Sequence, residues 1–345
     1  MVVLLGLAGL TVLALWGARR WAQAKAERGL GLSVPPGIDE RGFVRLGGLE
    51  QWVTIRGEDV RNPVLLILHG GPGAPHTMFT PDLRGWERDF TLVQWDRAGA
   101  GKTFARNGKT PLRFERQVED ALELRAELER RLPARPVVLL SSSAGTMVAL
   151  PLVQRRPELF AAWVGTDFNP GLAACERVAM PATLAWARAK GTRAEVAFLE
   201  QAAANTSWDL LTWNRLMRLR DKTAREGMGA IFLPRMVRAP DYDVLDFVAV
   251  LRGLEFSTAQ LLPQMQAFDA HAVRALKLPT FIFQGEEDVA TPAAVAQAWC
   301  EALEAPQKHF ELLPGVGHLG GFVHPSLLLE LLQRHVRPVA VRGER

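Results

Sequence analysis

The sequence predicts an α/β fold in which a mostly parallel central sheet carries a helical insertion. Short apolar runs, which indicate buried strands, alternate with helical segments through the first half of the chain. The pattern is then helical from about 170 to 270, and strand character returns only afterwards. A chain of 345 residues can form one large domain or two.

The expected strands follow each other along the chain, and the first two alternate as in an antiparallel pair. The strands are expected at 42–46, 51–56, 64–68, 90–95, 137–140, 161–165, 280–284 and 308–313. A polar amphipathic helix is expected at 116–131, directly before the strand at 137–140.

The chain begins with an uncharged stretch at 2–18, and Arg19, Arg20, Lys25 and Arg28 follow it. As a helix it would reach about 26 Å, close to the hydrocarbon core of about 30 Å. We therefore expect a single-pass membrane anchor at 1–20, with a cleaved signal segment as the alternative. The positive flank favours the rest of the chain on the cytoplasmic side.

The remaining boundaries follow from composition and from the helical insertion. A linker rich in proline and glycine is expected at 21–40, and a short tail at 337–345. The α/β core should comprise 41–169 and 271–336, interrupted by a helical cap at 170–270.

Charge and cysteine content exclude some classes of function. The 41 basic and 37 acidic residues give a net charge of +4, and the basic residues are scattered, so no nucleic-acid partner is expected. Cys175 and Cys300 lack the spacing of a metal site, and no metal or cofactor is expected.

The strand at 137–140 runs into Ser141-Ser142-Ser143-Ala144-Gly145, after which a helical pattern resumes. A strand, a sharp turn of small residues and a helix are typical of a nucleophile elbow, whose usual pattern is Gly-x-Ser-x-Gly. Serine replaces the first glycine here, at Ser141. We predict that Ser143 is a nucleophile.

A glycine-rich loop, His69-Gly70-Gly71-Pro72-Gly73, follows the strand at 64–68. Such a loop leaves backbone N–H groups open to a ligand. We expect the amides of Gly71 and Ala144 to form an oxyanion hole. His69 opens the loop and is expected to hold its shape rather than to act as a base.

The last two strands end in residues that would complete a catalytic triad. Asp288 follows the strand at 280–284, and His318 follows the strand at 308–313. The carboxylate would orient the imidazole, which would act as the general base. The alternatives are Glu286, Glu287 and Asp167 for the acid and His324 for the histidine. The order Ser143, Asp288, His318 is that of α/β-hydrolases.

Together with the turn at 96–101, these motifs resemble the proline iminopeptidase family of α/β-hydrolases, over about 42–332. The resemblance implies removal of an N-terminal residue from peptides through an acyl-enzyme, without metal or organic cofactor. It also implies cap glutamates that hold the free amine of the substrate, one of them after a pair of tryptophans. The nearest stretch here is Trp208 to Trp213, but Asn214 follows it in place of a glutamate, which leaves Glu176 and Glu255 as candidate substrate-binding carboxylates.

The predicted function is therefore a serine hydrolase on small peptides, an aminopeptidase or amidase of the proline iminopeptidase type. The alternatives are a carboxylesterase on small apolar esters and an inactive, membrane-tethered binding protein. Gly99–Thr103 resembles the end of a phosphate-binding loop, but Asp96 occupies the position of the required first glycine. Nucleotide binding is therefore not expected.

Overall fold

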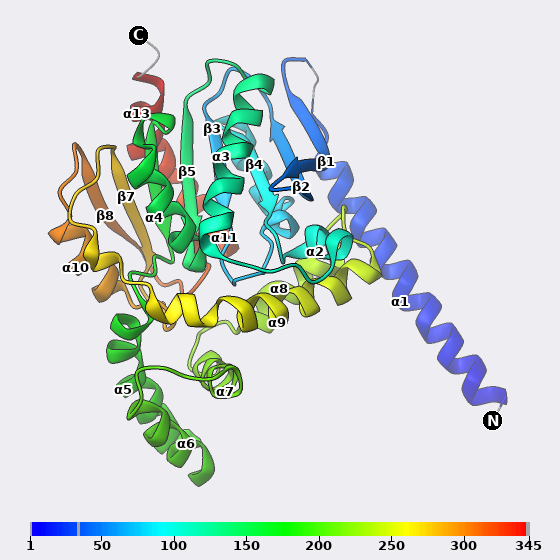
Figure 1. Ribbon diagram of the computed structural model, residues 1–345. Coiled ribbons are helices and arrows are strands. Elements are labelled where there is room, and N and C mark those ends of the chain that lie inside the picture. Colours follow the sequence, from blue (N-terminus) through cyan, green and yellow to red (C-terminus); the bar gives the residue numbers. More distant parts are fainter. Residues whose placement is uncertain (1, 33–34, 343–345) are drawn as a thin grey trace.

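The computed structural model describes residues 2–32 and 35–342 (Figure 1). The described residues form one eight-stranded sheet in the order β1-β2-β4-β3-β5-β6-β7-β8. The strands are β1 (Ile38–Leu46), β2 (Leu49–Gly57), β3 (Val64–Leu68), β4 (Thr91–Asp96), β5 (Val137–Ser142), β6 (Ala162–Thr166), β7 (Thr280–Gly285) and β8 (Lys308–Leu313).

The six strands β3 to β8 are mutually parallel, and β1 and β2 join the edge at β4 in antiparallel pairing. The mostly parallel sheet predicted from the sequence is confirmed. The chain reverses its direction of travel across the sheet between β3 and β5, which are neighbours although β4 intervenes in the sequence. Ligands of open parallel sheets bind at such a switch point, beyond the carboxyl ends of the strands.

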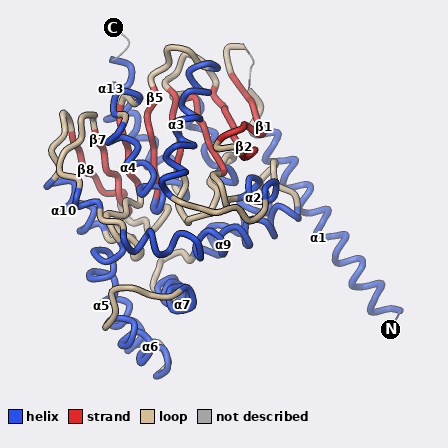
Figure 2. Tube along the Cα trace, viewed as in Figure 1, coloured by secondary structure: helices blue, strands red, loops and turns tan. Residues whose placement is uncertain are grey.

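Both faces of the sheet are covered by helices, as Figure 2 shows, so the central strands are apolar on both sides. In β3, Val64, Leu66 and Leu68 belong to one core, while Leu65 and Ile67 belong to the other. The first core includes α3 (Phe114–Arg131), α4 (Thr146–Arg155) and α10 (Ala293–Ala302). The second includes the 3₁₀ segment η2 (Asp82–Arg88), α11 (Gly320–Val323), α12 (Pro325–Leu331), the π-helical turn η6 (Leu332–Val336) and α13 (Arg337–Arg342).

Five helices lie between β6 and β7 in the chain and extend from the carboxyl-terminal side of the sheet (Figure 1). They are α5 (Leu172–Lys190), α6 (Arg193–Ala203), α7 (Leu210–Asp221), α8 (Met228–Arg238) and α9 (Val244–Ala267). We refer to these five helices as the cap. The short α2 (Gly101–Asn107) packs against α9, which connects the cap to the turn after β4.

The prediction of an N-terminal membrane anchor at 1–20 is wrong. Within the described residues, no helix has both the length and the apolar content that crossing a bilayer requires. The uncharged stretch is shorter than the roughly 20 apolar residues that a span needs. It forms only part of α1 (Val2–Gly29), which continues through charged residues. The predicted single-pass topology, with the core on the cytoplasmic side, is therefore wrong as well.

The C-terminal half of α1 is instead fixed to the cap. The Arg19 guanidinium donates to the carbonyl of Tyr242 at 2.6 Å, and the Gln23 amide donates to the carbonyl of Ala239 at 2.8 Å. Figure 1 shows α1 running away from the sheet, with this end beside β1 and α8.

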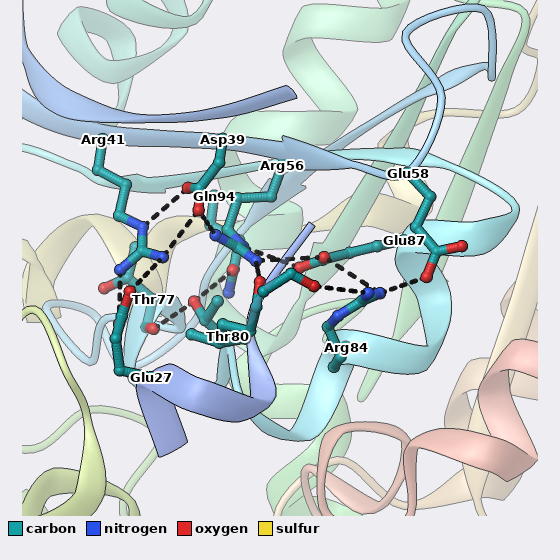
Figure 3. A network of polar contacts seen from close by, with 12 residues as sticks. Glu27, Asp39, Arg41, Arg56, Glu58, Thr77, Thr80, Arg84, Glu87 and Gln94 are labelled. Atoms are coloured by element: carbon teal, nitrogen blue, oxygen red, sulfur yellow. Dashed lines mark hydrogen bonds and ion pairs between the residues drawn. The ribbon is translucent and has the colours of Figure 1, made fainter. Parts of the chain in front are cut away.

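Arg56 connects this end of α1 to the sheet and also forms a buried ion pair (Figure 3). Arg56 of β2 donates from Nε to Glu87 of η2 at 2.9 Å and from Nη2 to the carbonyl of Leu30 at 2.6 Å. The same guanidinium also contacts Asp39 of β1. The side chains of Arg56 and Glu87 are 1% and 0% exposed, so both buried charges need compensation, which the pair itself supplies together with Asp39 and, at 3.5 Å from Glu87, Arg84.

We expect Arg56→Met to lower the free energy of unfolding by about 3 kcal/mol, because Glu87 would stay buried with only the more distant Arg84, at 3.5 Å, to compensate its charge. Urea unfolding followed by circular dichroism measures the change. The matched control is Arg61→Met, whose ion pair with Asp59 is formed by a largely exposed arginine. That variant should unfold like the parent chain. Equal curves for the two variants would contradict a stabilising role for the buried pair.

Candidate active site

Ser143 stands at the sharp turn between β5 and α4. Its backbone φ of 52° lies in the left-handed region, the strained geometry of a nucleophile elbow. Glycines allow the two strand ends to approach it: a Cβ on Gly70 would lie 2.7 Å from the Cβ of Ser143, and one on Gly145 would lie 2.4 Å from the carbonyl oxygen of Leu68. The glycine-rich loop after β3 therefore packs directly against the elbow.

The serine that replaces the first glycine of the elbow pattern has its own partner. Ser141 is fully buried in β5, and the indole N–H of Trp163 donates to its hydroxyl at 3.0 Å. The extra side chain thus satisfies a buried indole on the neighbouring strand and does not disrupt the turn.

Three predicted site residues meet at the carboxyl ends of β5, β7 and β8. The Ser143 hydroxyl lies 3.2 Å from Nε2 of His318, and Nδ1 of His318 lies 2.8 Å from Oδ2 of Asp288. In the neutral imidazole whose proton is on Nδ1, the serine donates to Nε2 and the histidine donates to the carboxylate. The side chain of Asp288 is 0% exposed and that of His318 is 13% exposed, so both are largely withdrawn from solvent.

Asp288 is held from several directions. Its Oδ1 accepts from the backbone amides of Ala290 and Thr291, both at 2.8 Å. Its Oδ2 accepts from the hydroxyl of Thr291 at 2.7 Å and from the amide of Gln284 at 3.1 Å. Glu286, a predicted alternative, instead accepts from the backbone amide of Gly315 at 2.9 Å.

A second buried carboxylate, Asp167 at the end of β6, faces the same histidine. The ligand atoms of Asp167, Asp288 and His318 all lie within 4.8 Å of one another. Asp167 accepts from the Ser142 hydroxyl at 2.8 Å and from the backbone amide of Leu319 at 2.7 Å. It therefore connects the elbow to the loop that carries His318. The sequence offered Asp167 only as an alternative acid, and its position at a strand end was the clue.

The charges in this cluster displace the pKa values of its members. Burial alone would lower the pKa of His318, but Asp288, and then Asp167, outweigh it and raise the pKa to about 9. Burial raises the pKa of Asp167 to about 6, with the charge of Asp288 adding to the effect. Burial also disfavours the charged form of Asp288, but His318 and the hydrogen bonds to the carboxylate hold its pKa below the usual value.

His69 holds the glycine-rich loop in place. Its Nδ1 donates to the carbonyl of Gly70 at 2.8 Å, and its Nε2 accepts from the backbone N–H of Arg97 at 3.2 Å. The Arg97 guanidinium also contacts the carbonyl of His69. Burial, followed by the charge of Arg97, lowers the pKa of His69 well below its usual value, so the ring is neutral. Gly71, with φ of 114°, follows in this loop.

The predicted substrate-binding residues of the cap do not join this cluster. Glu176 of α5 is buried in a bidentate ion pair with Arg220 of α7, with one N–O distance of 2.6 Å. Glu255 of α9 lines a separate cavity of about 790 Å³ between α9 and α2. Trp208 and Trp213 pack against each other with ring centroids 6.0 Å apart, within the apolar core of the cap.

Two other cavities border the loops that carry His318 and Asp288. One, of about 370 Å³, is lined by His318 and by Glu226 of the cap, and the other, of about 430 Å³, is lined by Asp288. Arg225 contributes to the wall of both and donates to the carbonyl of Gly315 at 3.0 Å.

The lysine of the phosphate-loop-like stretch has protein partners. Lys102 donates from Nζ to Asp246 at 2.9 Å and to the carbonyl of Asp241 at 2.8 Å. A short helix, α2, does start at Gly101, where the sequence gave no reason to expect one. The backbone amide of Lys102 donates to Asp96, the residue that replaces the glycine of a phosphate-binding loop.

Comparison with known proteins shows which family the chain belongs to. The family model described as serine aminopeptidase, S33, matches residues 62–320. The chain is 26% identical to the probable aminopeptidase YbaC of Bacillus subtilis (strain 168) over 301 residues, which cover 85% of this chain and 94% of that protein.

Solved structures support the fold. The proline iminopeptidase of Mycobacterium smegmatis superposes with a TM-score of 0.59 at 18% identity, covering 89% of this chain and 100% of that one. A membrane phospholipase A described as a bacterial virulence factor gives 0.61 at 17% identity, covering 98% and 96%. The chain is a hydrolase and belongs to the serine aminopeptidase S33 family of proline iminopeptidase-like α/β-hydrolases.

Proposed function

We propose that the protein is a serine hydrolase that works through an acyl-enzyme, with Ser143 as nucleophile, His318 as general base and then acid, and Asp288 as the residue that orients His318. The observation that carries the proposal is the unbroken chain of contacts from Ser143 to His318 at 3.2 Å and from His318 to Asp288 at 2.8 Å. Nucleophile, base and orienting carboxylate in this geometry suit acyl transfer.

In this mechanism Ser143 attacks the substrate carbonyl while its proton passes to Nε2 of His318. His318 then returns the proton to the leaving group, and water hydrolyses the acyl-enzyme by the same route. The backbone amides of Gly71 and Ala144 would stabilise the oxyanion, a contact typically worth about 10²–10³ in rate for each donor. The packing of the glycine-rich loop against the elbow supports this assignment.

The substrate class that we propose is a small peptide or amide with a free N-terminal amine, which makes the protein an aminopeptidase. The similarity to a probable aminopeptidase supports this choice. Glu226 supports it as well, because its exposed carboxylate lines the cavity beside His318, where it could pair with a substrate ammonium group.

One observation favours a second candidate, a carboxylesterase on small apolar esters. Arg220 binds the carboxylate of Glu176, so this carboxylate is not free to bind the amine of a peptide substrate. An esterase needs no such carboxylate.

Ser143→Ala should abolish covalent labelling by a fluorophosphonate probe and lower the rate of hydrolysis by about 10⁴-fold or more. Ser141→Ala is the matched control. The hydroxyl of Ser141 bonds Trp163, so this variant should still be labelled by the probe at Ser143. In-gel fluorescence measures both. Labelling that persists in Ser143→Ala would refute the assignment of the nucleophile.

The rate should rise with pH until His318 loses its proton, since only the neutral imidazole can act as a base. The raised pKa of about 9 places the acidic limb of kcat/KM near pH 9 in the free enzyme. Asp167→Asn removes a negative charge that favours the imidazolium, so the limb should move to lower pH by about 1–2 units. Initial rates across pH measure the limb, and an unmoved limb would exclude electrostatic coupling of Asp167 to His318.

Aminoacyl-naphthylamides and p-nitrophenyl esters, tested side by side, distinguish the two substrate classes. If Glu226 binds the amine, Glu226→Gln should raise KM for the naphthylamides by about 10-fold or more and leave ester hydrolysis unchanged. Glu255→Gln, in the separate cavity, is the control and should change neither. Ester hydrolysis by the parent chain without action on free-amine substrates would favour the esterase.

A further inference from the structure

Three side chains with metal-binding groups converge on the edge strand of the sheet, apart from the catalytic cluster. His309 and Glu311 lie two residues apart in β8, on one face of the strand, and His335 comes from the π-helical turn η6. Nε2 of His309 is 2.9 Å and Nε2 of His335 is 3.1 Å from the same oxygen, Oε2 of Glu311. All three ligand atoms lie within 4.8 Å of one another.

These separations are close to those that one metal ion would impose. Zinc binds imidazole nitrogen and carboxylate oxygen at about 2.0–2.2 Å in tetrahedral geometry, which sets neighbouring ligand atoms about 3.4 Å apart. The two nitrogen–oxygen distances of 2.9 and 3.1 Å are shorter by only a few tenths of an ångström. Small side-chain rotations would therefore be enough to admit an ion.

The two imidazoles are held in place before any ion binds. Their rings stack with centroids 4.1 Å apart and an interplanar angle of 27°. The ring centroid of Phe283 in β7 lies 6.3 Å from that of His309 and 6.2 Å from that of His335. The π-helical turn carries His335, and such turns occur frequently at functional sites. The side chains are 23–35% exposed, which leaves a path from solvent.

One arginine, Arg334, also faces the carboxylate of this cluster. Arg334 lies 3.4 Å from Oε1 of Glu311, the other oxygen of the carboxylate, so Oε2 remains directed at the two imidazoles. Two neutral imidazoles and one carboxylate are a ligand set that suits zinc, copper, nickel and iron.

We propose that His309, Glu311 and His335 bind one divalent transition-metal ion, with water in the fourth position. The ion would cross-link β8 to the C-terminal helical segment. This site lies at the start of β8, whereas His318 follows the end of that strand. From His309 to Leu313 the strand rises about 13 Å. We therefore assign the ion to stability and not to hydrolysis.

The test is a calorimetric titration of the chelator-treated full-length chain with zinc chloride near neutral pH. We expect one zinc per chain and a rise of a few degrees in the melting temperature at saturating zinc. His335→Gln should weaken binding by at least about 10-fold and remove the rise. Glu311→Gln keeps a hydrogen-bond acceptor, so it should melt like the parent without metal but fail to bind zinc.

Two controls assign the ion to its site. His271→Gln changes another histidine that lies beside a carboxylate, Asp269 at 2.9 Å, and should bind zinc like the parent. His318→Gln removes the histidine of the catalytic cluster and should also retain the zinc. The proposal is overturned if the parent chain binds no zinc, if Glu311→Gln binds it equally well, or if binding is lost in His318→Gln.

Discussion

The ends of β3 and β5 pass so close together that no side chain fits between them, and the geometry of the site depends on this contact. Leu68 pairs with Ser141 in the sheet, and the chains then diverge around Gly70 and Gly145. A Cβ at Gly70 would meet the Cβ of Ser143, and one at Gly145 would meet the carbonyl oxygen of Leu68. The same contact brings the glycine-rich loop, at Gly70, to the side of Ser143. Sheet register thus fixes the position of the Ser143 hydroxyl, and the loop after β8 supplies its partner, His318.

Around that hydroxyl, two carboxylates share one imidazole. Asp288 contacts His318 directly, while Asp167 bonds the elbow through Ser142 and the histidine loop through Leu319. Both carboxylates are buried, so their charges are weakly screened and act strongly on His318. In the proposed acyl transfer, this arrangement would favour the imidazolium of His318, but it would also keep more of that imidazole protonated at neutral pH before substrate binds.

How much of this was visible in the sequence depends on whether a feature follows from local pattern or from tertiary packing. The apolar runs predicted the parallel sheet, and the rule that strand ends meet at one edge brought Ser143, His318 and Asp288 together. The hydrophobic pattern led to a wrong prediction for α1. An uncharged stretch does not reveal that its helix continues through Arg19 and Gln23, which bond the cap. It also missed the pairing of His335 with β8, which depends on how a C-terminal turn packs 24 residues beyond Glu311.

In the cap, too, the sequence did not reveal the tertiary partners of the candidate substrate-binding glutamates. From the sequence, Glu176 and Glu255 were equivalent, since each is a carboxylate in a helical segment. In the structure Arg220, 44 residues away, binds Glu176, and a substrate amine would have to compete with a buried guanidinium for it. Such a pair is broken only at high cost, because the displaced charge would remain buried. If the substrate carries a free amine, as we propose, its recognition would fall to an exposed carboxylate in the cavity beside His318, such as Glu226, and not to the buried glutamate.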